Sequence, residues 1–243
     1  TSYFLLKKCE FGDYHEINTI ERLSNYKKIF LIDCGCNYGF YSLYTSSLDI
    51  NNLIISVEAS KNTSDEFIKN LKLNNFSNIN FYNNTVSNID DQSVLFYESE
   101  NDWESSQSHS NFKISLKTKI QSIKIDTLVK GYNLGNYITI IKLDIEGNEV
   151  NAILGALDVI KKKNPLIIIE FSKYIFKNLD NINYIKKFLL EYDYSIYDTN
   201  KNKKNLEDIL LMIKQLKNKH KTIGNFYLIK NLSNNLKIFL SND

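Results

Sequence analysis

Cysteine and proline are scarce in this chain of 243 residues, and neither sign of charge is in large excess. Its three cysteines, Cys9, Cys34 and Cys36, cannot all pair with one another, and their spacing fits neither a secreted disulfide framework nor a zinc site. We therefore expect a reducing compartment, the cytoplasm. No apolar run reaches the roughly 18 residues of a membrane span, so none is expected.

The charge balance also excludes some partners. Lys and Arg number 30 against 28 Asp and Glu, and the lysines are spread along the chain instead of forming one stripe. This pattern predicts no nucleic-acid partner. A hydrophobic fraction of 43% is ordinary for a folded protein, and the length fits a single domain over 1–243 with a cap at the sheet edge over 1–28. The sequence leaves open whether the protein is a homodimer.

The chain is organised around the turn that follows its first apolar run. Residues 29–32 form an apolar run that ends at Asp33. Gly35 and Gly39 follow as turn residues, and the apolar residues over 38–48 have helical spacing. This order predicts a strand, a tight turn and a helix. At the carboxyl end of a first strand, such a turn is typical of a site for a nucleotide-like ligand.

Alternating strand and helix patterns follow along the chain. Strands are predicted over 53–57, 79–82, 138–143 and 166–169, with helices over 62–73 and 148–161 among those between them. We predict an α/β fold with a doubly wound, mostly parallel sheet of about seven strands. The last strand, over 226–229, suits an antiparallel edge. A β-hairpin with strands over 94–97 and 112–116 is inserted over 92–117, where it could serve as an acceptor lid.

Four of the predicted strands end in an acid. These are Asp33, Glu58, Asp144 and Glu170. The carboxyl ends of parallel strands share one edge of the sheet, so the four carboxylates repel one another and lose solvation there. A cation, a sugar hydroxyl or a proton transfer would use such a cluster.

The spacing of the glycines narrows the choice of ligand. Gly35 and Gly39 do not form the Gly-x-Gly-x-x-Gly pattern of a dinucleotide site, and Asp33 would repel a pyrophosphate. S-Adenosylmethionine fits better, because it is cationic, lacks phosphate and offers a ribose to Glu58. Two alternatives stay open: an NAD-dependent sugar oxidoreductase or epimerase, and a non-catalytic binding protein on the same fold.

Four segments resemble the FkbM-type family of class I S-adenosylmethionine-dependent methyltransferases. They are Asp33-Cys34-Gly35-Cys36-Asn37-Tyr38-Gly39-Phe40-Tyr41-Ser42, Val57-Glu58-Ala59-Ser60, Ile141-Lys142-Leu143-Asp144-Ile145-Glu146-Gly147-Asn148-Glu149 and Ile167-Ile168-Ile169-Glu170. The resemblance implies a Rossmann-like fold and O-methylation, often of sugar hydroxyls in glycans or of natural products. The family commonly has a proline or another small residue after the ribose acid, whereas Ala59-Ser60 follow Glu58 here.

The predicted cofactor-binding residues surround the turn. They are Asp33, Gly35, Asn37, Gly39, Glu58, Ser60, Asn84 and Asp144. Asn37 could bind the cofactor carboxylate or only cap the following helix. Ser60 and Asn84 could line an adenine pocket or be ordinary loop residues.

The predicted catalytic residues are Asp144, His109 and Glu170. Asp144 could orient the acceptor hydroxyl, take its proton or bind a divalent metal, or it could only cap the helix after Gly147. No third ligand accompanies Asp144 and Glu170, so no metal is expected. His109 is a candidate general base. Trp103 and Glu146 are predicted to bind the substrate, with Trp103 stacked on a sugar face.

Overall fold

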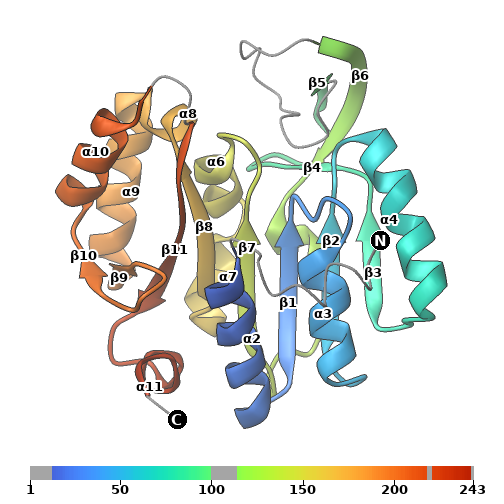
Figure 1. The fold of residues 1–243 in the computed structure, drawn as a ribbon, viewed down its shortest axis with the longest axis horizontal. Coiled ribbons are helices and arrows are strands. Elements are labelled where there is room, and N and C mark those ends of the chain that lie inside the picture. Colours follow the sequence, from blue (N-terminus) through green and yellow to red (C-terminus); the bar gives the residue numbers. More distant parts are fainter. Residues whose placement is uncertain (1–12, 100–113, 218–220, 242–243) are drawn as a thin grey trace.

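The computed structural model describes residues 13–99, 114–217 and 221–241, and its centre is an eight-stranded sheet (Figure 1). The strands are ordered β10-β9-β11-β8-β7-β1-β2-β3. Their bounds are β1 Ile29–Cys34, β2 Leu53–Val57, β3 Ile79–Tyr82, β7 Ile138–Leu143, β8 Leu166–Ser172, β9 Tyr194–Tyr197, β10 Lys203–Lys204 and β11 Thr222–Lys230. Five neighbouring strands, β8, β7, β1, β2 and β3, are mutually parallel, as the apolar runs predicted.

The sheet ends in antiparallel strands. β11 is antiparallel to both β8 and β9, and β10 is antiparallel to β9. The predicted antiparallel strand is therefore confirmed, but it lies between β8 and β9, and the two-residue β10 forms the edge. The order of strands reverses between β1 and β7, since the chain continues from β1 toward β2 on one side and from β7 toward β8 on the other. In α/β sheets this reversal leaves a crevice above the carboxyl ends.

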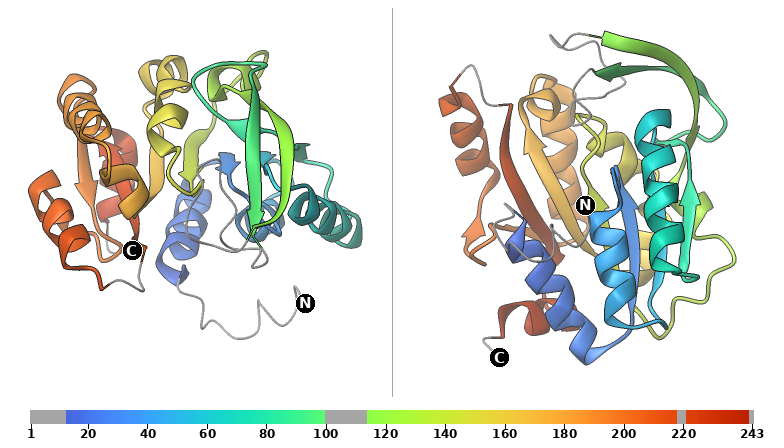
Figure 2. Two further views of the ribbon diagram at one scale, coloured as in Figure 1. Left: turned by 90° about the horizontal axis from the view of Figure 1, so that it is seen from above. Right: turned by 45° about the vertical axis from the view of Figure 1, so that its right-hand side comes forward.

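Helices cover both faces of the sheet, as the view from above shows (Figure 2). One face is packed by α5 Ile125–Leu128, α6 Glu149–Leu154, α7 Leu157–Lys163, α8 Lys173–Phe176, α9 Leu179–Glu191 and α10 Leu206–Gln215. The other is packed by α2 Tyr14–Tyr26, α3 Phe40–Leu48 and α11 Asn234–Leu240. α4 Lys61–Asn74 places the buried Phe67 against Phe81 of β3. No helix of the described residues is both long and apolar enough to cross a membrane.

The first described helix lies on a face of the sheet. Ile20 and Leu23 of α2 are buried in one cluster with Leu31 of β1 and Ile140 of β7, which are central strands. The predicted position of this helix at the sheet edge is therefore wrong. The helical repeat of Ile17, Ile20 and Leu23 indicates a buried stripe but carries no information about which strands it meets.

The single helix predicted over 148–161 is two helices, α6 and α7. The break comes at Gly155 and Ala156, where a Cβ on Gly155 would lie 2.1 Å from the carbonyl oxygen of Ser87. The second helix is capped from elsewhere in the chain, because the Asp126 carboxylate accepts the backbone N–H groups of Asp158 at 3.0 Å and Val159 at 2.9 Å. The first N–H groups of a helix have no partner within that helix, and Asp126 provides one for α7.

The inserted hairpin is confirmed as part of a second, three-stranded sheet with the order β4-β6-β5. Its strands are β4 Thr85–Val86, β5 Ser93–Ser99 and β6 Ile114–Ile123. β5 and β6 pair antiparallel, and β6 runs further than the predicted strand over 112–116, of which residues 112 and 113 lie outside the described residues. The small sheet stands above the carboxyl ends of the main strands, beside α4 (Figure 1).

Candidate active site

The turn after β1 is held by the carboxylate of Glu58, at the end of β2. One Glu58 oxygen accepts the backbone N–H of Asn37 at 3.0 Å, and the other accepts the N–H of Ser60 at 2.8 Å. Asn37 has a φ of 50°, and its side chain accepts the N–H of Tyr38 at 2.7 Å. Asn37 therefore shapes the turn through its own side chain, a role that asparagine performs well in the left-handed region.

The two glycines of the turn pack against neighbouring parts of the site. Gly35 has a φ of 76°, and a Cβ there would lie 1.9 Å from the carbonyl oxygen of Asp144. At Gly39, a Cβ would lie 2.0 Å from the ring of Phe67. The glycines let the turn approach the end of β7 and α4 closely, because a side chain at either position would collide with them. The spacing of the glycines in the sequence does not reveal these contacts.

Glu58 is 9% exposed, and its pKa is raised to about 7. Burial is the largest cause of the rise, and the N–H groups of Ser60 and Asn37 oppose it by stabilising the ionised form. A carboxylate that accepts one bond on each oxygen keeps further lone pairs for a ligand. The geometry is therefore compatible with the predicted contact between Glu58 and ribose hydroxyls.

Asp33 faces into the protein. It is 1% exposed, and one carboxylate oxygen accepts the hydroxyl of Ser42 at 2.6 Å, while Ser42 and Ser56 share a bond of 2.7 Å. The other oxygen is buried without a hydrogen-bond partner. Burial raises the pKa of Asp33, and Lys142 and Ser42 oppose that rise. The structure gives Asp33 contacts inside the fold, and its contact with a cofactor stays a prediction.

Asp144, at the end of β7, is paired with a buried lysine that the sequence analysis did not select. The Nζ atom of Lys142 lies 2.9 Å from Asp144, and the two side chains are 3% and 36% exposed, respectively. Lys142 is the register partner of Asp33 on β1, and its Nζ lies 4.6 Å from the centre of the Tyr41 ring. Burial alone would lower the pKa of this lysine, but Asp144 and Asp33 outweigh burial and raise it.

A signal for Lys142 was present in the sequence. Side chains two positions apart in a strand point to the same face, so Lys142 in an otherwise apolar run lies on the side of Asp144. A lysine is almost never buried without a partner of opposite charge. The position of Lys142 therefore predicts an ion pair with a neighbouring acid.

Glu170 lies inside β8, which continues to Ser172, so the prediction that this strand ends at Glu170 is wrong. Burial and the charges of Asp144 and Glu146 raise its pKa to about 8, while a hydrogen bond from Thr222 opposes the rise. Glu146 has a φ of 53° in the loop before α6. Glu149 is fully buried, and one of its oxygens accepts the N–H groups of Ile145 at 3.1 Å and Gly147 at 3.2 Å. Glu149 thus closes the loop that carries Glu146.

The remaining predicted residues divide into three cases. Ser60 caps α4, where its hydroxyl oxygen accepts the N–H of Thr63 at 3.2 Å. Asn84 is directed to the small sheet and donates to the carbonyl of Gln121 at 3.0 Å. Its neighbour Asn83, which was not selected, donates to the carbonyl of Glu58 at 2.8 Å. Trp103 and His109 lie outside the described residues.

The chain matches the family model of the methyltransferase FkbM domain over residues 33–196. The chain belongs to the FkbM methyltransferase family. The resemblance of its four segments to that family is therefore confirmed, and the chain is a methyltransferase domain. No curated protein matches the sequence.

Two solved structures show that the fold of this FkbM domain is shared. Methyltransferase FkbM from Methylobacillus flagellatus KT is 15% identical with a TM-score of 0.50, over 83% of this chain and 43% of that one. This chain thus spans less than half of that protein. A proposed caffeoyl-CoA O-methyltransferase from Staphylococcus aureus is 12% identical with a TM-score of 0.51, over 95% of this chain and 92% of that one.

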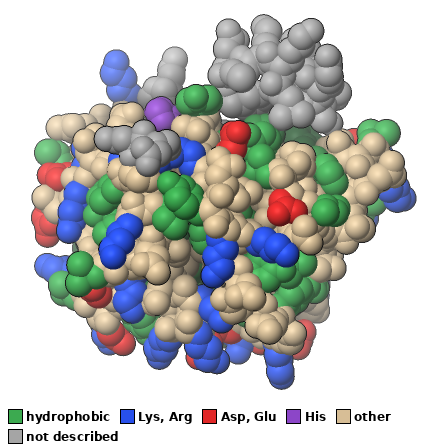
Figure 3. Space-filling view, turned by 90° about the horizontal axis from the view of Figure 1, so that it is seen from below, with side chains coloured by type: hydrophobic (Ala, Val, Ile, Leu, Met, Phe, Trp, Pro, Cys, Tyr) green, Lys and Arg blue, Asp and Glu red, His purple; other side chains and the backbone are tan. Residues whose placement is uncertain are grey.

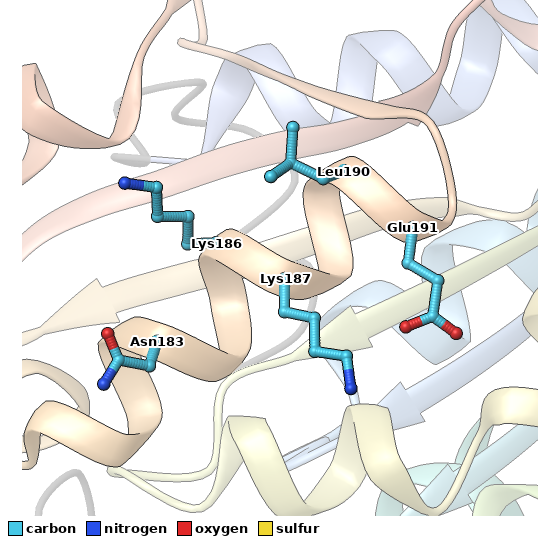
Figure 4. Close-up of a pocket in the computed structure, with 5 residues that line it drawn as sticks. All are labelled: Asn183, Lys186, Lys187, Leu190 and Glu191. Carbon is cyan, nitrogen blue, oxygen red and sulfur yellow. The ribbon is translucent and has the colours of Figure 1, made fainter.

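Two surface hollows of the FkbM domain lie apart from the predicted site residues. One is lined by Asn183, Lys186, Lys187, Leu190 and Glu191, which all come from the exposed side of α9 (Figure 4). The other is lined by Lys27, Lys28, Asn133, Asn136 and Tyr137, near the amino ends of β1 and β7. Figure 3 shows the molecule from the side of those amino ends, where lysines are scattered among polar and apolar side chains.

Asp144 and Glu170 are the two acids that could bind a divalent metal. Within 13–99, 114–217 and 221–241, no group of three or more His, Cys, Asp or Glu side chains is placed to hold a metal ion. Asp144 and Glu170 are close enough to influence each other electrostatically, and Asp144 is already bound to Lys142.

Proposed function

We propose that this FkbM domain transfers a methyl group from S-adenosylmethionine to a hydroxyl of a sugar, a glycan precursor or a related small molecule. The observation that carries the proposal is the position of Glu58 and Asp144, which follow the two parallel neighbours of β1, beside the turn that Glu58 holds through Asn37, in a chain of a methyltransferase family. Asp33 lies within electrostatic reach of Glu58 and of Asp144, and Asp144 of Glu170, so the acids form one group.

The residues present fit this methyl donor. A cationic molecule without phosphate suits an edge lined by carboxylates, whereas a pyrophosphate would be repelled. Glu58 has lone pairs left for the ribose hydroxyls, and the 36% exposed side chain of Asp144 remains accessible. When bound, S-adenosylmethionine supplies a methyl group that is activated by its attachment to a sulfonium.

The chain's own groups then have distinct tasks. Asp144, held by Lys142 at 2.9 Å, would orient the acceptor hydroxyl. Glu170, with a pKa raised to about 8, would accept the hydroxyl proton, because a base works best when its pKa lies near the working pH. Trp103 and His109 remain candidates for the acceptor side, as predicted from the sequence.

Calorimetry tests which cofactor the chain binds and so separates this proposal from its alternatives. We expect the purified chain to bind S-adenosylhomocysteine and not NAD. Binding of NAD without S-adenosylhomocysteine would indicate the oxidoreductase or epimerase instead. Failure to bind either molecule would contradict the assignment of Glu58.

Mass spectrometry tests the acceptor. The chain is incubated with S-adenosylmethionine carrying a labelled methyl group and with matched sugars, glycans and phenols. A labelled methyl ether on a sugar supports the proposal, and a labelled phenol ether or amine would redirect it. A chain that binds the donor but labels no acceptor would fit a non-catalytic binding protein.

A further inference from the structure

Glu98 is a buried acid outside the group formed by Asp33, Glu58, Asp144 and Glu170. It lies on β5 of the small sheet and is 2% exposed. Its carboxylate accepts the hydroxyl of Ser60 at 3.2 Å and the backbone N–H of Lys61 at 3.3 Å. Ser60 is the N-cap of α4 and Lys61 is its first residue. The small sheet thus contributes a hydrogen-bond acceptor to the amino end of a 14-residue helix, where backbone N–H groups lack partners within the helix.

Ser60 connects Glu98 to the predicted ribose acid. The backbone N–H of Ser60 donates to Glu58 at 2.8 Å, and the hydroxyl of Ser60 donates to Glu98. The same hydroxyl oxygen accepts the backbone N–H of Thr63 at 3.2 Å and the Thr63 hydroxyl at 3.0 Å. A serine hydroxyl has one hydrogen and two lone pairs, so these three bonds fix its orientation.

The hydrogen bonds therefore run without a gap from the small sheet to the turn after β1. Glu98 holds Ser60, Ser60 holds one oxygen of Glu58, and the other Glu58 oxygen accepts the N–H of Asn37 at 3.0 Å. A displaced Ser60 would remove one of the backbone N–H groups that hold the buried Glu58 carboxylate. A change at Glu98 is thereby transmitted to Glu58 through Ser60.

We infer that Glu98 is a positioning residue of the methyl-donor site, which acts through Ser60 on the carboxylate of Glu58 and makes its strand, β5, part of that site. The inference rests on the proposed function, because it takes Glu58 to bind the ribose of the donor. It adds a role on the donor side to a hairpin that the sequence predicted as a lid for the acceptor. Glu98 and Ser60 are 38 positions apart, so the link exists only in the folded chain.

A purely structural role for Glu98 makes a different prediction. If Glu98 only caps α4, its loss lowers the stability of the chain but leaves the donor affinity of the folded protein unchanged. If Glu98 positions Glu58, its loss weakens donor binding only while Glu58 is present. A double-mutant cycle on ligand affinity distinguishes the two roles.

The experiment measures the affinity of the whole chain for S-adenosylhomocysteine by calorimetry. The variants are Glu98→Ala, Glu98→Gln, Glu58→Gln and the double variant Glu58→Gln/Glu98→Ala. We expect Glu98→Ala to weaken binding about tenfold, and Glu98→Gln, which keeps one carbonyl acceptor, to weaken it less. The double variant should bind as Glu58→Gln does. Glu66→Ala, an exposed acid on the same helix paired with Lys69, is the matched control and should bind as the unchanged chain does.

Each other outcome has a definite meaning. Wild-type affinity in Glu98→Ala with a lowered melting temperature would overturn the inference and leave Glu98 as a cap. The inference would also be overturned if the fold-loss of affinity in the double variant equalled the product of the fold-losses in the two single variants, since Glu98 would then act independently of Glu58. If Glu98→Ala does not fold, Glu98→Gln provides the same comparison. An unchanged chain that binds no S-adenosylhomocysteine would reject the proposed donor, and the inference with it.

Discussion

Lys142 is a buried ammonium that faces Asp33 across the β1–β7 pair and binds Asp144 at 2.9 Å. A buried charge is tolerated when it is paired, and its removal leaves the partner charge without compensation. Lys142 therefore serves two acids, one inside the fold and one at the exposed end of β7. The orientation of Asp144 depends on a residue that would not itself contact a substrate.

Replacement of Lys142 with Met should lower the free energy of unfolding by about 3–5 kcal/mol, because two buried or half-buried carboxylates lose their counter-charge. Urea unfolding followed by circular dichroism measures the change. Lys162→Met is the control, since Lys162 pairs with Asp158 on an exposed helix surface and should change stability by less than about 0.5 kcal/mol. Equal effects of the two substitutions would show that Lys142 is not the counter-charge of the site.

Replacement of Asp144 with Asn should leave the affinity for S-adenosylhomocysteine largely unchanged while methyl transfer collapses. The substitution keeps the size of the side chain but removes the charge that orients the acceptor hydroxyl. Calorimetry measures the affinity, and labelled methyl transfer measures the turnover. Unchanged turnover would remove Asp144 from the mechanism.

Replacement of Glu58 with Ala should weaken binding of S-adenosylhomocysteine by roughly 1–3 kcal/mol, the effect of losing a charged hydrogen-bonding partner. The pKa of Glu58 is raised to about 7, so the ionised acceptor becomes more populated as the pH rises from 6 to 8. Donor affinity should rise over the same range. Glu58→Gln should lose this dependence on pH, and a dependence that persists in this variant would assign it to another group.

At the scale of elements, the close approach of the turn to β7 decides where Asp144 lies. Gly35 packs on the backbone of Asp144, and the N–H groups of Gly35 and Cys36 donate to the carbonyl of Val57 at 2.9 and 3.1 Å. The turn therefore connects the ends of β1, β2 and β7. A displaced turn would move Asp144 and Glu58 together.

Gly35→Ala should destabilise the chain by more than about 2 kcal/mol. The new methyl group would collide with the carbonyl of Asp144, in addition to the strain of a positive φ, which is about 1–2 kcal/mol for a residue with a side chain. Gly131→Ala separates the two effects, because Gly131 has a φ of 92° and nothing within 4 Å of the added Cβ. Thermal unfolding compares them, and equal losses would mean that the collision is relieved without cost.

At the scale of the whole molecule, acids whose pKa is raised by burial influence how stability depends on pH. The pKa values of Glu58 and Glu149 are raised from 4.5 to about 7, and that of Glu170 is raised to about 8. Burial is the largest cause in each case. Between about pH 4.5 and these values, the folded chain holds protons that the unfolded chain has released, so stability falls as the pH rises.

The melting temperature should therefore be lower at pH 8 than at pH 5.5, by several degrees for a chain of this size. Scanning calorimetry in buffers of equal ionic strength measures it. Glu149→Gln removes one of the three groups and should flatten the dependence. A melting temperature that rises from pH 5.5 to pH 8 would contradict the raised pKa values.

Much of the fold could be predicted from local patterns. The apolar runs that became β1, β2, β7 and β8 were recognised because parallel strands buried on both faces are apolar throughout. Glu58 and Asp144, which directly follow β2 and β7, were recognised from the same runs, whereas Asp33 and Glu170 lie inside β1 and β8. The break at Gly155 was missed, because it depends on the distant backbone of Ser87 and on a cap from Asp126.

The sequence by itself determined that this chain alternates strands and helices, that a tight turn follows the first strand, and that Glu58 and Asp144 follow two of the central strands. These features depend on periodicity and on residue type, which are local. Only the tertiary structure decided that Lys142 binds Asp144, that Gly35 contacts Asp144, and that Glu98 reaches Ser60. Such contacts depend on strand register and close packing between segments far apart in the chain, which no local pattern records.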